Sequence, residues 1–237
     1  MVTRLYFRST SNGLSNLPTN EQSSLTPTLT SDAVTVNKTL DETIGDGQVG
    51  LVITSNATNT LQNLYFSRFV SPYLDMASLP AQTWTYNFAT TQTNTSGNFP
   101  VSGSNKPVRV NCYVWRPSTQ AIVGTVLDGN TSSTYDEIAA NAKRVGTGTF
   151  SGAAVNSMTN GDVLVFEVWF AVTQASSTSY TFTWWYNGTT ENTTKNSNVT
   201  NHASFVESPQ TLTFYSPPTN MDVTNSKTYT GKFIIKV

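Results

Sequence analysis

The sequence has very few of the side chains that carry out chemistry. It contains one cysteine, Cys112, one histidine, His202, and 13 basic and 14 acidic residues among 237. Most enzyme mechanisms take their bases, nucleophiles and metal ligands from these residue types. A single cysteine also excludes an internal disulfide. We therefore expect a protein that builds a structure rather than an enzyme, with no catalytic residue, no metal and no cofactor.

Long apolar runs and clusters of positive charge are also missing. No run of about 18 apolar residues occurs, so we expect no membrane-spanning helix. The opening residues, MVTRLYFRSTSNG, lack the apolar segment of a secretory signal, and the methionine at position 1 favours a chain made without one. The formal net charge is only -1, and no Lys/Arg cluster is present to bind phosphates, so nucleic acid is not an expected partner.

Threonine, serine and asparagine take the place of the charged residues. The chain has 40 Thr, 26 Ser and 23 Asn, while aromatic residues make up 11% and supply apolar area for a core. Low net charge together with this aromatic content argues against disorder. Seven Asn-x-Ser/Thr sequons occur, about as many as this composition produces by chance, so they do not indicate glycosylation.

Short runs rich in β-branched and aromatic residues, separated by Gly, Asn, Ser and Pro, predict strands along the whole chain. The runs cover residues 3–8, 49–54, 61–70, 82–89, 108–115, 121–127, 146–155, 163–172, 180–186, 210–215 and 229–237. This spacing predicts an all-β fold, an antiparallel β-sandwich of jelly-roll type. One segment, 135–143, has acidic residues in its first turn and basic residues at its end, which predicts a short helix in a loop.

The chain is expected to divide into three parts around one core. Residues 1–32 form an N-terminal strand and polar arm, residues 33–215 the β-sandwich core domain, and residues 216–237 a C-terminal tethered strand. A tethered strand can pair with its own sheet or with the open edge of a neighbouring subunit. The candidate assembly residues on the two terminal strands are Arg4, Tyr6, Phe7, Tyr229, Phe233 and Ile235.

Two strands show a clear inside and outside. In residues 108–115 the valines and Cys112 share one face, which predicts a core face, and the alternate residues are expected to face outward or toward an interface. Cys112 is therefore expected to be a small buried side chain. Glu167 interrupts the apolar strand 163–172, which predicts either an ion pair with an arginine at position 68, 109 or 116, or exposure on the outer face.

Aromatic residues offer a candidate binding surface. Trp84, Trp184 and Trp185 lie on strands with alternating aromatic residues, an arrangement that flat sugar-binding platforms use. The same alternation is typical of a sheet core or a subunit interface, so both interpretations stay open.

Four segments together resemble a known group of proteins. They are TRLYFRST (3–10), SPYLDMASLPAQTWTYNF (71–88), TGTFSGAAVNSMTNGDVLVFEVWF (147–170) and ASFVESPQTLTF (203–214). In this order they resemble a loose family of virion structural proteins of tailed phages and related viruses, which commonly carry a TRLY strand, an SPxLxAQT stretch and a final LTF strand. The resemblance implies a location in the virion and no catalytic residues. The polar block 189–201 and the strand after Pro218 depart from that pattern.

The leading hypothesis is a non-enzymatic virion structural protein. It would decorate a capsid or form part of a tail through large surface contacts and terminal strand addition, with copies of itself and other virion proteins as partners. One alternative is a subunit of an extracellular filament or surface layer joined by donor strands. Another is a carbohydrate-binding adhesin that recognises a host-surface glycan.

Overall fold

The computed structural model describes residues 2–22, 25–30, 37–56, 60–93, 99–100, 108–131, 137–138, 142–172 and 179–215. This part of the chain contains fourteen strands and no helix, and hence no helix able to cross a membrane. The strands are β1 (Thr3–Ser11), β2 (Leu29–Thr30), β3 (Asn37–Asp41), β4 (Val49–Thr54), β5 (Gln62–Tyr73), β6 (Gln82–Gln92), β7 (Phe99–Pro100), β8 (Val108–Arg116), β9 (Ala121–Thr131), β10 (Glu137–Ile138), β11 (Arg144–Gly152), β12 (Val163–Val172), β13 (Thr181–Tyr186) and β14 (Phe205–Ser208).

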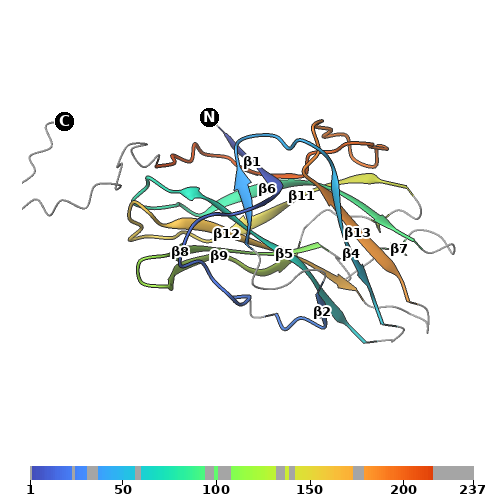
Figure 1. Cartoon of the computed structure of the whole chain (residues 1–237), viewed down its shortest axis with the longest axis horizontal. Helices are drawn as coiled ribbons and strands as arrows, with labels where there is room; N and C mark the ends of the chain where they lie inside the picture. The colour runs from blue at the N-terminus through green and yellow to red at the C-terminus, as the bar shows by residue number, and fades with distance from the viewer. Residues whose placement is uncertain are drawn as a thin grey trace, which may run out of the picture.

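Twelve of these strands form one sheet that is folded over into two layers (Figure 1). The strand order is β4-β13-β6-β14-β1-β3-β5-β12-β8-β9, with β11 paired to β6 and β2 paired to β5. β1 joins the layers, because it pairs with β14 on one side and with β3 on the other. Most pairs are antiparallel, whereas β2 and β3 run parallel to β5. The predicted all-β sandwich is confirmed.

The core between the layers is largely aromatic. Trp84 of β6 packs against Phe166 of β12 with ring centroids 5.5 Å apart, and Trp184 of β13 packs against Phe69 of β5 at 5.4 Å. Phe7 of β1 lies 4.8 Å from Phe69 and 5.1 Å from Trp184. Edge-to-face pairs of this kind each contribute about 0.5–1.5 kcal/mol beyond area burial. The first strand is therefore fixed in the centre of the fold, within the same sheet as the body of the chain.

The polar arm that follows β1 lies against the outer face of the layer that holds β5, β8 and β12 (Figure 1, blue). Within residues 12–22, the carbonyl of Asn16 accepts a hydrogen bond from Trp115 Nε1 at 2.8 Å. The carbonyl of Pro18 accepts one from Arg68 Nη1 at 2.6 Å. A segment with few large apolar groups thus docks in part through its backbone carbonyls, which every residue carries.

The docked arm buries part of the outer face of β8. Leu14 and Leu17 of the arm pack on an apolar cluster that includes Tyr113. Asn111 and Tyr113, which alternation places opposite the valines, are buried beneath the arm. This face was expected to look outward or toward an interface, and at these two residues it is instead covered by the arm of the same chain. Cys112 is buried with the valines, as predicted.

The predicted helix over residues 135–143 is not confirmed. Its described part includes β10, which pairs antiparallel with β7 through Glu137↔Pro100 and Ile138↔Phe99. Residues 135–136 and 139–141 lie outside the described residues, and so does the whole C-terminal segment 216–237 with Tyr229, Phe233 and Ile235. At Glu137 and Ile138, pairing between distant segments outweighs a local helical pattern.

Candidate functional site

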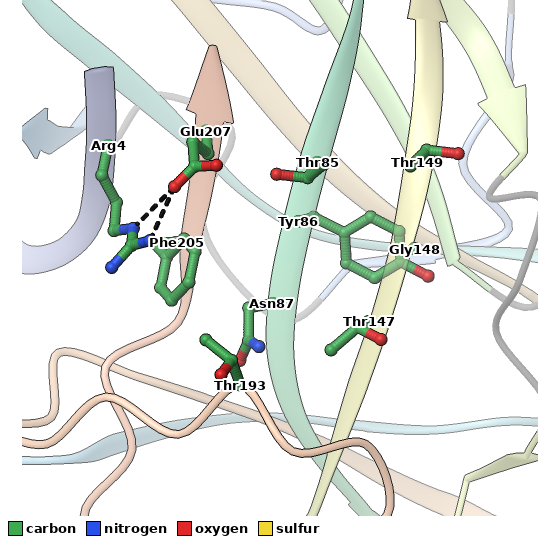
Figure 2. A pocket seen from close by; sticks show the side chains of 10 residues that line it. All are labelled: Arg4, Thr85, Tyr86, Asn87, Thr147, Gly148, Thr149, Thr193, Phe205 and Glu207. Carbon is green, nitrogen blue, oxygen red and sulfur yellow. Dashed lines mark hydrogen bonds and ion pairs between the residues drawn. The ribbon is translucent and has the colours of Figure 1, made fainter. Parts of the chain in front are cut away.

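A shallow groove of about 350 Å³ lies on the outer face of the layer formed by β1, β14, β6 and β11 (Figure 2). Most of its lining side chains carry a hydroxyl or amide group, and one arginine–carboxylate pair stands at one side. The lining residues are Arg4, Thr85, Tyr86, Asn87, Thr147, Gly148, Thr149, Thr193, Phe205 and Glu207.

The strand registers build this groove from residues far apart in the sequence. Two rows run across the four strands, one through Arg4, Glu207, Thr85 and Thr149, the other through Tyr6, Phe205, Asn87 and Thr147. Neighbours within a row are one strand spacing apart, about 4.8 Å. Because alternate residues of a strand share a face, both rows present their side chains on the same surface.

Arg4 is held by two carboxylates at the side of the groove. Its Nε and Nη2 donate to Oε2 of Glu207 at 3.0 and 2.6 Å, and its Nη1 donates to Oε2 of Glu191 at 2.5 Å. The guanidinium carbon lies 4.4 Å above the centre of the Phe205 ring. Partial burial acts to lower the pKa of Arg4, but the bonds to Glu207 and Glu191 outweigh it and raise that pKa. The arginine therefore stays charged, and its charge is compensated.

Glu191 also ties the loop between β13 and β14 to the sheet. The Tyr6 hydroxyl donates a hydrogen bond to Oε1 of Glu191. Burial and this bond raise the pKa of Tyr6 to about 12. Burial acts to raise the pKa of Glu191, but the bonds from Tyr6 and Arg4 lower it overall. These contacts fix the loop that carries Thr193, the residue at one end of the groove (Figure 2).

The structure does not form the predicted aromatic surface. Trp84 and Trp184 have no exposed surface, because alternation turns both rings into the core between the layers. Trp185 is half-buried, with its Nε1 donating to Thr91 at 2.6 Å and the Lys143 ammonium 3.8 Å from its ring centre. The prediction that these three rings form a binding platform is therefore wrong.

The predicted assembly residues of the first strand are divided between two environments. Arg4 and Tyr6 belong to the outer face beside the groove, and Phe7 is fully buried in the core. The threonines and Asn87 that line the groove were missed, since these residue types are so common here that no single one carries a signal. Only the alternation of Thr83, Thr85 and Asn87 with apolar residues marked this face of β6 as outward.

Glu167 is a structural carboxylate. Its Oε1 lies 3.3 Å from Arg68 Nε, which confirms the predicted ion pair, and both side chains are fully buried. It also accepts hydrogen bonds from Asn111 Nδ2 at 2.9 Å, from the Tyr113 hydroxyl at 3.1 Å and from the backbone N–H of Gln22 at 3.0 Å. Burial raises the pKa of Glu167, although these partners act against the increase. Glu167 is not among the residues that line the groove beside Arg4.

The remaining chemistry-bearing residues are isolated. His202 is buried, and burial lowers its pKa to about 4, although the backbone of Asn87 and the charge of Glu191 act against that decrease. Burial raises the pKa of the Cys112 thiol well above its usual value. In the part of the chain that the structure describes, no three His, Cys, Asp or Glu side chains are grouped as metal ligands.

The edge strand β4 is a second candidate site, as a comparison with the edge strand at the other end of the sheet shows. β4 pairs with β13 in unbroken register from Val49↔Tyr186 to Thr54↔Thr181, it carries no charged residue, and Val52 is 52% exposed. β9, at the opposite end, pairs with β8 through three register irregularities and contains Asp128. Irregularities and charges of this kind protect an edge from pairing, so β4 is the less protected edge.

Comparison of the chain with models of known protein families and with curated proteins finds no match.

Proposed function

We propose that this chain is a non-enzymatic virion structural protein that decorates a capsid or forms part of a tail. Its partners are copies of itself and other virion proteins, which it contacts through large surfaces and by strand addition. The observation that carries the proposal is the regular, uncharged and exposed edge of β4. The resemblance of four sequence segments to virion structural proteins supports the location.

An open edge strand is a pairing template, because its outward N–H and C=O groups lack strand partners. Within the described residues β4 pairs only with β13. Val49 and Val52 on this strand are 37% and 52% exposed. An added strand would pair with the backbone of β4 and cover apolar side chains at the same time, as in β-strand addition generally.

The strand that the proposal adds to β4 is residues 227–237 of a second copy. In this segment, KTYTGKFIIKV, Tyr229, Phe233 and Ile235 share one face of an extended strand, and the other face is polar apart from one isoleucine, a pattern that favours a strand with one buried face. Residues 216–226 precede it and can span up to about 36 Å when extended. That reach suits a strand that leaves its own subunit, while pairing with its own sheet is the competing arrangement.

Sedimentation velocity over a range of protein concentrations tests the strand addition. The full chain is expected to form concentration-dependent oligomers, and a chain that ends at residue 215 and the variant Val52→Lys are both expected to stay monomeric. Ile122→Lys is the matched control, because Ile122 is 39% exposed on the protected edge strand β9. A monomeric full chain at all concentrations would overturn strand addition, as would oligomers that persist in both variants.

Mass spectrometry of purified virions tests the location. The proposal predicts the protein among the virion components, and its absence would overturn a virion role. Strand addition also suits a subunit of an extracellular filament or surface layer, because a head-to-tail contact that does not close produces an open fibre. Electron microscopy of the assembled full chain separates the two, since fibres without a virion would favour the filament.

A further inference from the structure

The lining of the groove beside Arg4 matches the chemistry of a ligand rich in hydroxyl groups. The side chains of Thr85, Asn87, Thr147 and Thr149 stand in the two rows across β6 and β11, and Thr193 lies at the end (Figure 2). Hydroxyl and amide groups can both donate and accept hydrogen bonds. Such a surface pairs with hydroxyls in either direction and discriminates little between donors and acceptors.

The ion pair at the side of the groove supplies a stronger acceptor. Glu207 uses one oxygen, Oε2, for both bonds from Arg4, and its Oε1 has no hydrogen-bond partner within the described residues. In Figure 2 this second oxygen is on the side of the carboxylate that faces Thr85. A carboxylate accepts a hydroxyl hydrogen bond about twice as strong as a neutral acceptor does.

A further acceptor at the end of the groove lacks a donor. Asn87 is 2% exposed, and its Oδ1 has no partner among the described groups. A buried acceptor without a donor is unfavourable, so a donor from a ligand or from water is expected at this position. Asn87 and Thr193 both line the groove (Figure 2), so a ligand in the groove can supply this donor.

Charge and backbone pairing narrow the class of ligand. The guanidinium of Arg4 is already bonded to Glu207 and Glu191, so it does not offer a free positive charge to an anion. β6 is paired on both sides along the groove, with β11 and with β14, so its backbone does not offer an edge to an extended peptide. The volume, about 350 Å³, lies at the lower end of the range of small-ligand sites.

We infer that this groove binds a neutral carbohydrate, as a mono- or disaccharide unit that lies over β14, β6 and β11. Hydroxyls of the sugar bond to Thr85, to the free oxygen of Glu207 and to Asn87. This site differs from a tryptophan platform in residues and in chemistry, and it is separate from the β4 edge. A carbohydrate contact therefore adds a recognition role to a structural protein.

The test is binding of the full chain to an array of neutral and anionic glycans, followed by titration calorimetry with a neutral glycan that binds. Thr85→Val removes one hydroxyl with little change in shape, and we expect it to weaken binding about five- to tenfold. Thr83→Val is the matched control, because Thr83 is exposed on the same strand and outside the groove lining, and we expect unchanged affinity. The assembly variant Val52→Lys is also expected to bind the glycan normally.

Three outcomes would overturn the inference. The first is no binding to any neutral glycan, and the second is binding to anionic glycans alone. The third is binding that Thr85→Val and Thr83→Val affect equally. None of these outcomes bears on strand addition at β4, which sedimentation measures separately.

Discussion

Arg68 and Glu167 face each other across the paired strands β5 and β12, with Nε 3.3 Å from Oε1 and both side chains fully buried. The pair also holds the N-terminal arm, since Arg68 donates to the carbonyl of Pro18 and Glu167 accepts from the backbone of Gln22. A buried ion pair of this kind links three parts of the chain that are distant in sequence.

Removal of one partner of this pair is expected to destabilise the fold strongly. Glu167→Leu leaves the Arg68 charge buried without its carboxylate, which costs about 3–5 kcal/mol. The double variant Arg68→Met/Glu167→Leu removes both charges and is expected to lose less than the sum of the two single changes. Urea unfolding followed by tryptophan fluorescence measures each free energy. Additive losses would contradict the coupling.

Because His202 is buried, we expect the folded protein to lose stability in mild acid. Its pKa is about 4 in the folded protein, below the ordinary 6.5, because it is buried. Between these values the unfolded chain binds a proton that the folded chain does not. The stabilising contribution is therefore fully present above pH 6.5 and is lost as the pH falls toward 4, by up to about 3 kcal/mol. Urea unfolding from pH 7 to pH 4 is the measurement, and His202→Gln is expected to show a smaller decrease. Equal decreases would show that other groups cause it.

In the turn before β4, alanine substitutions at two neighbouring glycines are expected to differ in their effect on stability. A Cβ at Gly45 would lie 2.1 Å from the backbone oxygen of Asn187, whereas a Cβ at Gly47 would have no heavy atom within 4 Å. Gly45→Ala is expected to cost about 1–3 kcal/mol through overpacking. Gly47→Ala is expected to stay within about 0.5 kcal/mol. Thermal unfolding compares the variants, and equal midpoints would contradict the close approach.

The hydrogen bond from Trp115 is expected to help hold the arm against the sheet. Trp115→Phe removes the bond to the carbonyl of Asn16 and is expected to cost about 1 kcal/mol. Hydrogen exchange of residues 12–22 should become faster. Trp185→Phe is the control, because it loses a similar indole bond, to Thr91, far from the arm. Equal exchange of the arm in both variants would contradict a specific role for Trp115.

Alternation predicted the interior of single strands well. The valines of β8, Cys112 and the apolar face of β12 are buried as their period of two indicates, because alternate residues of a strand share one face. For Glu167 the same reasoning left either an ion pair with an arginine or exposure on the outer face, since a carboxylate that is buried in an apolar strand needs a partner. Which of three arginines supplies that partner depended on the register between β5 and β12.

By itself the sequence determined the all-β class and the buried face of its clearest strands, because the sequence pattern of one strand controls both. The tertiary structure decided which strands are neighbours, where the arm docks and which threonines meet Glu207 in one groove. Strand pairing and arm docking use backbone groups that are the same in every residue. A chain rich in Thr, Ser and Asn has few distinctive side chains on its outer faces, so the partner of each strand is selected by the packing of the whole core.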